Sequence, residues 1–142
     1  MTLHPCTPQD APELARLNRM LIEDEKAENS MALPELERRM ADFLSADYAA
    51  FFFEENTRRI GYALVRMSAT PLYLRQFFIG REHRRMGYGR QAFRALLEHL
   101  QTDEIDLDVY AWNEAGMAFW KSLGFYERCH NMRMKQQAAH KE

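Results

Sequence analysis

Gly87 and Gly89 flank Tyr88, behind a run of arginines and ahead of a helix-like apolar segment. Glycine has no Cβ, so two glycines at this spacing let a ligand approach the backbone closely. The first N–H groups of the following helix lack intrahelical partners, and the helix macrodipole favours negative charge there by about 0.3–1 kcal/mol. The surrounding cationic residues are Arg81, Arg84, Arg85 and Arg90. The sequence therefore predicts an anion site suited to a pyrophosphate.

Two other phosphate-binding motifs compete for these residues. A P-loop needs a lysine after its second glycine, but Arg90 stands there. The spelling of a dinucleotide-binding fingerprint is satisfied by residues 87–92, and Asp106 or Asp108 lies at a suitable distance to hold a ribose. In that fold the first glycine turns directly off a strand, whereas residues 80–86 intervene here. The fingerprint is therefore the less favoured interpretation.

The pattern Arg84-x-x-Gly87-x-Gly89 resembles the acetyl-coenzyme A loop of the GNAT superfamily of N-acetyltransferases. In that loop a glutamine or arginine precedes Gly-x-Gly or Gly-x-Ala. Residues 78–84 look like the strand and turn that precede it in the family. Residues 113–125 are similar to the second family signature, an asparagine-headed helix that closes in Leu-Gly-Phe. The order of predicted elements matches the family from near residue 1 to about residue 134.

The resemblance implies that acetyl-coenzyme A is the acetyl donor and that no metal takes part. In the family the loop strand splays from its neighbour, so its backbone pairs with the pantetheine arm and one N–H polarises the thioester carbonyl. The loop backbone holds the pyrophosphate, and the asparagine of the second signature reaches the pantetheine from the other side. The residues expected at the cofactor are Phe77, Phe78, Ile79, Arg84, Arg85, Met86, Gly87, Tyr88, Gly89, Arg90, Asn113 and Trp120.

Two positions depart from the family pattern. Trp120 stands where a tyrosine usually protonates the leaving thiolate, and an indole is no acid at neutral pH. Gln76 stands nearest to the glutamate that often serves as the base. We therefore rank two carboxylates as candidate catalytic bases: Asp108, near the carboxyl end of its predicted strand, and Glu28, in a connection that borders the acceptor site in the family. Ordered water is the alternative to a single base.

The resemblance implies acetyl transfer to a primary amine of a small molecule, or to a lysine or N-terminal amine of a protein. The acidic residues within 23–28 favour a cationic acceptor if they line its site. Because Trp120 cannot protonate the leaving thiolate, Tyr110, Tyr126 or water would supply that proton. The alternative is a non-catalytic acyl-coenzyme A-binding sensor, in which Trp120 marks lost chemistry.

The order of the helices and strands expected to position these residues indicates an α/β domain. Its sheet should be mixed and twisted, with six or seven strands, and about four helices should cover it. Helices are expected over residues 8–25, 34–44, 87–100 and 114–123, from caps and apolar periodicity. Strands are expected over residues 3–6, 49–54, 59–67, 72–79 and 105–110, and from Phe125 onward. Residues 1–134 form the expected N-acetyltransferase domain, and residues 135–142 a solvated C-terminal tail.

Composition limits the partners. The chain has 142 residues, enough for one domain, and 19 basic against 21 acidic residues give a net charge of −2. We therefore expect binding to neither nucleic acid nor membrane, although the local arginines keep nucleic acid as a minor alternative. Cys6 and Cys129 fit neither a disulfide framework nor a metal spacing, which favours a cytoplasmic location. A homodimer that pairs residues 125–134 is left open.

Overall fold

The computed structural model describes residues 1–137 and contains one five-stranded sheet in the order β1-β2-β3-β4-β5. The strands are β1 (Thr2–Pro5), β2 (Tyr48–Glu55), β3 (Arg58–Arg66), β4 (Leu72–Ile79) and β5 (Ile105–Asp106). The helices are α1 (Ala11–Glu25), α2 (Leu33–Ser45), α3 (Tyr88–Leu100) and α4 (Glu114–Ser122), with 3-10 turns η1 (Pro8–Asp10) and η2 (Arg81–His83). Neighbouring strands from β1 to β4 are antiparallel, and β4 pairs with β5 in parallel. The sheet is therefore mixed, as expected.

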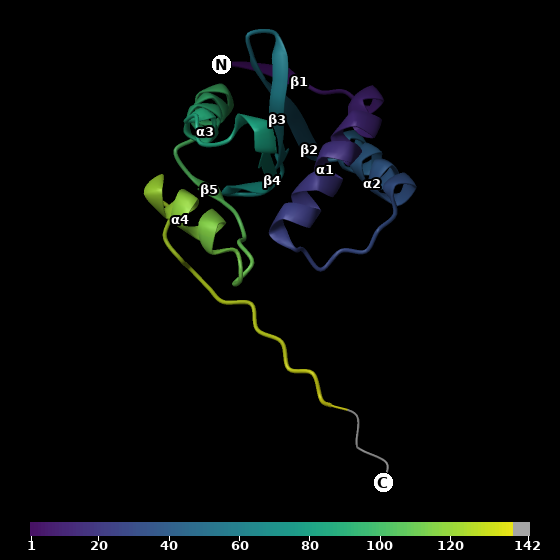
Figure 1. Ribbon diagram of the computed structural model, residues 1–142, viewed down its shortest axis with the longest axis vertical. Helices are drawn as coiled ribbons and strands as arrows, with labels where there is room; N and C mark the ends of the chain where they lie inside the picture. Colours follow the sequence, from purple (N-terminus) through teal and green to yellow (C-terminus); the bar gives the residue numbers. More distant parts are fainter. Residues whose placement is uncertain (138–142) are drawn as a thin grey trace.

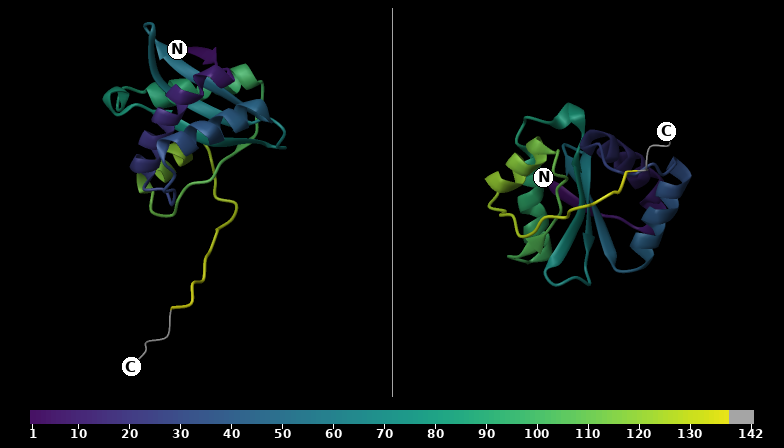
Figure 2. Two further views of the ribbon diagram at one scale, coloured as in Figure 1. Left: turned by 90° about the vertical axis from the view of Figure 1, so that its right-hand side faces the viewer. Right: turned by 90° about the horizontal axis from the view of Figure 1, so that it is seen from below.

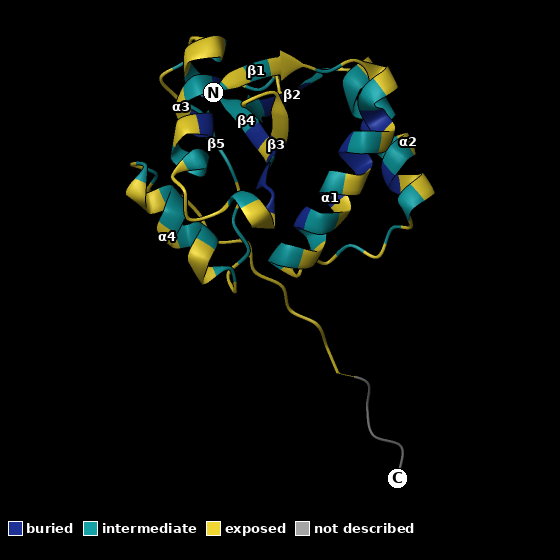
Figure 3. Cartoon of the chain, turned by 45° about the horizontal axis from the view of Figure 1, so that its top comes forward, coloured by how far each residue is buried: buried dark blue, intermediate teal, exposed yellow. Residues whose placement is uncertain are grey.

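Helices cover both faces of the sheet, α1 and α2 on one side and α3 and α4 on the other (Figure 1; seen from below in the right-hand view of Figure 2). The alternation of side chains along β2 explains this arrangement. Phe51 and Phe53 belong to the core under α3, whereas Phe52 belongs to the core under α1 and α2. The most deeply buried stretches lie in the middle strands and on the inner faces of the helices (Figure 3). A sheet covered on both faces accounts for the continuous apolar run in β2.

Local signals set the boundaries of several elements. Pro8 opens η1, which continues into α1, and Lys26 ends α1 in a left-handed conformation at φ 50°. Asn56 and Thr57 both have positive φ values, 52° and 64°, at the turn of the β2–β3 hairpin. A turn of this kind matches the right-handed twist of the strands that it joins.

Two predictions about the sheet are wrong within residues 1–137. The sheet has five strands rather than six or seven, because no strand follows α4. Phe125 packs against the core, but residues 126–137 are exposed, and their mostly polar side chains supply no apolar face that a sheet could bury. The predicted strand over residues 105–110 shrinks to β5, which ends at Asp106. The tail prediction for residues 135–142 falls partly on residues 138–142, which lie outside the described chain.

No helix within residues 1–137 is long and apolar enough to cross a membrane. The same residues bring together no group of three or more His, Cys, Asp or Glu side chains that would hold a metal ion.

Candidate active site

The loop before α3 presents unpaired backbone amides. Gly87 adopts φ 78° and Arg85 adopts φ 63°, so the chain turns twice through left-handed conformations before the helix begins. The first backbone hydrogen bond of α3 runs from the Gln91 N–H to the Gly87 carbonyl, at 3.2 Å. Within the described residues, the N–H groups of residues 85–90 donate to no backbone carbonyl. Unpaired amides at the positive end of a helix are the groups that an anion-binding cradle requires, and we refer to them as the amide cradle.

Gly89 has a second reason to be glycine. A Cβ at this position would lie 3.1 Å from Cζ of Phe119, which reaches the start of α3 from α4. The absence of a side chain therefore permits both close approach to the loop and the packing of α4 on α3.

Two of the loop arginines are held by α1 rather than pointing at the cradle. Arg81 donates from Nε to Oδ1 of Asp24 at 2.8 Å, and Arg84 bonds the other oxygen of the same carboxylate. Arg84 also donates from Nε to the Ile79 carbonyl at 2.9 Å. Burial works to raise the pKa of Asp24, but the hydrogen bonds from Arg84 and Arg81 outweigh it and lower that pKa. Asp24 thus fastens the loop to the end of α1.

The two parallel strands separate beside this loop. The β4–β5 register comprises only Leu72 with Ile105 and Tyr73 with Asp106, while β4 continues to Ile79. Within residues 1–137, no strand pairs with residues 74–79 on that edge. The opening of the sheet leaves backbone groups of Phe77, Phe78 and Ile79 beside the gap, where the sequence predicts that the pantetheine arm adds.

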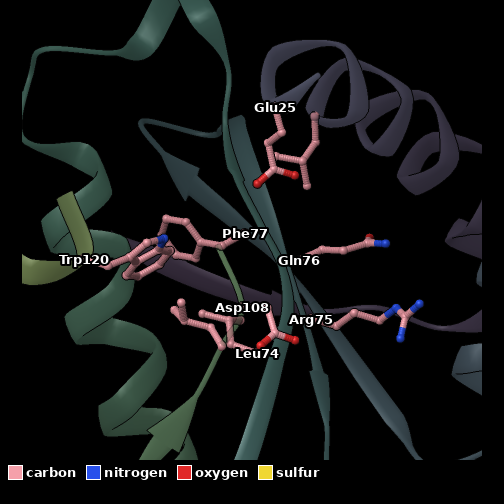
Figure 4. Close-up of a pocket in the computed structure, with 9 residues that line it drawn as sticks. Glu25, Leu74, Arg75, Gln76, Phe77, Asp108 and Trp120 are labelled. Atoms are coloured by element: carbon pink, nitrogen blue, oxygen red, sulfur yellow. The ribbon is translucent and has the colours of Figure 1, made fainter. Parts of the chain in front are cut away.

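A small pocket lies beside the opening between β4 and the segment after β5. Its lining is drawn in Figure 4 and consists of Leu21, Glu25, Leu74, Arg75, Gln76, Phe77, Leu107, Asp108 and Trp120. Its free volume is about 40 Å³, enough for very few water molecules. The end of α1 and one side of α4 close the pocket from opposite directions.

Comparison with known proteins supplies the family. The model of the Acetyltransferase (GNAT) family matches residues 14–125, which is most of the chain. The chain belongs to the GNAT acetyltransferase family. No curated protein matches it by sequence.

Solved GNAT-like structures share the fold at low sequence identity. A possible acetyltransferase from Clostridium difficile 630 has a TM-score of 0.76 and 16% identity, covering 97% of this chain and 98% of its own. A predicted acetyltransferase with acetyl-CoA from Clostridium acetobutylicum has a TM-score of 0.71 and 16% identity, with coverages of 94% and 95%. AAC(6')-Iy, in complex with the bisubstrate analogue CoA-S-monomethyl-acetylneamine, has a TM-score of 0.72 and 16% identity, with coverages of 96% and 98%.

Trp120 sits in an aromatic cluster on the wall of the pocket of this GNAT protein. Its ring centroid lies 5.1 Å from that of Phe77, 5.4 Å from Phe93 and 5.3 Å from Phe125. The indole thus joins α4 to β4 and α3. The tyrosines considered as substitute acids lie outside the lining: Tyr110 stacks on Trp112 at 4.7 Å, and Tyr126 is 79% exposed.

The structure separates the two carboxylates that the sequence ranks as bases. Asp108 lines the pocket, and its Oδ2 accepts a hydrogen bond from the Tyr73 hydroxyl at 2.8 Å. Burial, followed by this hydrogen bond to Asp108, raises the pKa of Tyr73. Glu28 lies outside the lining and accepts a 2.9 Å hydrogen bond from Arg133. Asp108 is therefore at the pocket and Glu28 is not.

The remaining polar groups of the site have structural partners. Gln76 is only 7% exposed, and its Oε1 accepts a hydrogen bond from the buried Tyr62 hydroxyl at 2.8 Å. Asn113 caps α4, since its Oδ1 accepts from the Gly116 N–H at 3.0 Å. Arg90 donates to Ser122 at 3.2 Å. Of the predicted cofactor residues in the loop, Arg84, Arg85, Met86 and Gly87 are exposed to solvent.

Glu25 is a pocket residue that the sequence interpretation includes among the acidic residues of 23–28 but does not rank as a base. Its carboxylate points from the end of α1 toward the pocket, with Asp108 on the opposite side (Figure 4). Burial, and then the charge of Asp24, raises the pKa of Glu25. A signal was present in the sequence, because Glu25 follows Leu14, Asn18 and Leu21 on one helical stripe, and those three are buried.

Proposed function

We propose that this GNAT protein transfers the acetyl group of acetyl-coenzyme A to a primary amine, either of a small molecule or of a lysine or N-terminus. One observation carries the proposal: the open edge of β4 borders a pocket that holds two carboxylates, and β4 leads from that pocket into the loop with the unpaired amides. The cradle suits a pyrophosphate, the open edge suits an extended arm with amide groups, and the carboxylates suit an amine.

The residues present fit the donor. Backbone amides of residues 85–90 would hold the pyrophosphate, and the edge formed by Phe77, Phe78 and Ile79 would pair with the pantetheine. Asn113 and Trp120 would flank that arm from the side of α4. When bound, acetyl-coenzyme A supplies a thioester whose carbonyl carbon accepts a nucleophile. Two of the structural neighbours were solved with acetyl-CoA or a CoA analogue bound, which supports this assignment.

The chain contributes polarisation and proton transfer. A backbone N–H on the free edge of β4 would stabilise charge on the carbonyl oxygen, an effect of about 2.7–4 kcal/mol in known oxyanion sites. The amine nitrogen forms the bond to the acetyl carbon and the bond from that carbon to sulfur breaks. The nitrogen loses a proton to water, and the thiolate takes a proton from water. A thiol pKa of about 8.5 makes the thiolate a tolerable leaving group without a tyrosine acid at Trp120.

The charge of the pocket favours a cationic acceptor. Asp108 and Glu25 face the pocket, whereas the guanidinium of Arg75 lies over the Phe43 ring, 4.8 Å from its centroid, and points away from Trp120 (Figure 4). Two carboxylates without a competing cation attract an ammonium group. The small volume of the pocket supports recognition of the amine end of the acceptor rather than its whole body.

A second candidate function is a sensor that binds acyl-coenzyme A without turnover. The observation that favours it is the packing of Trp120, which fills the usual acid position with a side chain that transfers no proton. The two functions share the cradle and the open edge and differ in thiol release.

Thermal unfolding with and without acetyl-coenzyme A, followed by thiol release against a panel of amines, tests both functions. Ligand at about 100 times its Kd adds about 2.7 kcal/mol of stability, which is readily detected. Stabilisation together with thiol release supports the transferase, and stabilisation with no release from any amine supports the sensor. A protein that millimolar acetyl-coenzyme A fails to stabilise has neither function.

A further inference from the structure

We propose that Glu25 is the general base that takes the proton from the acceptor amine. The inference rests on the proposed acetyl transfer and assigns a role that the sequence places on other residues.

The helix directs Glu25 into the pocket. Glu25 is the last residue of α1, one turn beyond Leu21, and both residues line the pocket. Side chains four apart lie on the same face of a helix, so the buried stripe of α1 ends in a carboxylate. Trp112 secures this end from across the opening, since its Nε1 donates to the Glu25 carbonyl at 2.9 Å. The carboxylate is thus held over the gap between β4 and the segment after β5.

The acidic neighbours of Glu25 are engaged elsewhere. Asp24 binds Arg81 and Arg84, Glu23 lies 3.9 Å from Arg81, and Glu28 binds Arg133. Within residues 1–137, the carboxylate of Glu25 makes neither a hydrogen bond nor an ion pair. A half-buried carboxylate without a cation keeps its affinity for a proton, which a base requires.

Asp108 differs from Glu25 in the same pocket. It is exposed to solvent, and its Oδ2 already accepts a hydrogen bond from the Tyr73 hydroxyl. Asp108 therefore suits the binding of the ammonium group, whereas Glu25 suits the removal of its proton. The structure thus divides attraction and proton transfer between two carboxylates on opposite sides of the pocket.

The charges that face Glu25 come from three elements. Asp24 neighbours it on α1, Arg75 stands on β4 with its guanidinium turned toward Phe43, and Asp108 lies beyond β5. Trp120 from α4 and Gln76 from β4 are neutral, and so is the Tyr62 hydroxyl from β3, whose pKa is raised by burial and also by Glu25. Burial and Asp24 raise the pKa of Glu25, so its deprotonated form, and with it the activity, develops at a higher pH than for an exposed glutamate.

The step conserves atoms and charge. One Oε of Glu25 takes a proton from the bound ammonium, directly or through one water, and the neutral nitrogen keeps its lone pair. The nitrogen forms the amide bond as the carbon–sulfur bond breaks, and it gives its second proton to water. Water protonates the departing thiolate, and Glu25 returns its proton to solvent.

The test is Glu25→Gln in the full chain, with Glu23→Gln as the matched control. Glu23 lies on the same turn of α1, and its side chain is 60% exposed. We expect Glu25→Gln to lower kcat by about 10²- to 10⁴-fold, while the thermal shift by acetyl-coenzyme A stays unchanged. The acid limb of the kcat/KM profile should disappear. Glu23→Gln should keep both the rate and the limb.

Three outcomes would overturn the assignment. The first is a kcat of Glu25→Gln within about two-fold of the wild type. The second is a change in Glu25→Gln that is confined to the KM of the amine. The third is an acid limb that persists in Glu25→Gln and vanishes in Asp108→Asn. If Glu25→Gln loses stability, Glu25→Asp provides the test, because it keeps a carboxylate. It should restore part of kcat and the acid limb of the kcat/KM profile. A wild type that releases thiol upholds acetyl transfer whatever the variants do, so the two proposals fail separately. A wild type that releases none with any amine overturns both.

Discussion

The loop before α3 and the pocket offer different kinds of chemical group. The loop offers main-chain N–H groups, positioned by Gly87 at φ 78° and by the start of α3. The pocket offers side chains, with Glu25 from α1 facing Asp108 from the segment after β5. A backbone site tolerates side-chain changes and fails when its conformation is denied, whereas a side-chain site fails when one functional group is removed. Substitutions should therefore separate the two regions.

The largest effect is expected from Gly61→Ala, a substitution that should disturb the loop and the pocket together. Gly61 in β3 pairs with Ile79, and a Cβ there would lie 1.9 Å from the Phe78 carbonyl oxygen. Gly61→Ala must push β3 from β4, at a cost of at least the 1–3 kcal/mol typical of overpacking. Because β4 serves both regions, thermal unfolding should show a lower Tm, and acetyl-coenzyme A and amine should both bind less well.

Gly80→Ala is the matched control for that variant. The nearest atom to its Cβ would be a side-chain carbon of His83 at 3.3 Å, which can move. A Gly61→Ala protein with the Tm of Gly80→Ala would contradict the close approach of the two strands.

Gly87→Val should affect the loop alone. A β-branched residue at φ 78° is strained by about 1–3 kcal/mol. The loop should therefore change its conformation, and the backbone N–H groups of residues 85–90 should lose their arrangement. We expect the acetyl-coenzyme A thermal shift to disappear. Gly124→Val is a matched control, because Gly124 has φ 100° and nothing within 4 Å of its Cβ position. It should lose stability and keep the thermal shift; loss of the shift in both variants would show that strain, not the loop, is responsible.

The same contrast explains what could be predicted from the sequence. Gly87, the Asn113 cap and the left-handed Gly124 at the end of α4 are local requirements, visible in a few neighbouring residues. Accordingly the four helices and the sequence positions of the loop were predictable. The fold supports the resemblance, and the family match to residues 14–125 confirms it.

The pocket depends on contacts that one sequence does not display. Trp112 meets Glu25 across 87 residues, and Tyr73 meets Asp108 across 35. Glu25 was hidden in a run of acidic residues whose other members bind arginines. The sequence predicts a further strand from Phe125 onward, behind α4. A strand forms only where it can pair with the edge of a sheet, and residues 126–137 pair with no strand in the described chain.

Trp120→Tyr tests the pocket. A phenol in place of the indole provides a proton donor where the family usually has one, and we expect kcat to rise about tenfold at neutral pH. The smaller ring packs less well against Phe77 and Phe93, so Tm should fall by a few degrees, as about 1 kcal/mol would produce. Trp112→Tyr, outside the pocket lining, places no proton donor in the pocket and should not raise kcat. An unchanged kcat in Trp120→Tyr would show that thiolate protonation does not limit turnover.

Asp24→Asn should have the smallest effect, because Asp24 lies in the connection between the two regions and acts on the pocket only through the charge that it places beside Glu25. Asp24 holds Arg81 and Arg84, whose guanidinium groups are partly exposed, and such pairs contribute up to about 1 kcal/mol. A looser loop should raise the KM for acetyl-coenzyme A up to about five-fold and leave kcat at saturation unchanged. A fall in kcat equal to the rise in KM would mean that Asp24 acts in the chemistry, and the comparison between loop and pocket would no longer hold.

The pH dependence of that variant gives an independent check. The pKa of Asp24 is lowered in the folded protein, so its stabilisation is present above the usual value of 3.8 and is lost as the pH falls through the lowered one. The Tm difference between wild type and Asp24→Asn should therefore be full at pH 7 and shrink below about pH 3.8. Asp42→Asn, an exposed change on α2, should show no such trend. A difference that persists unchanged in acid would mean that Asp24 stabilises the loop through packing, and that the arginines are held to α1 by something other than its charge.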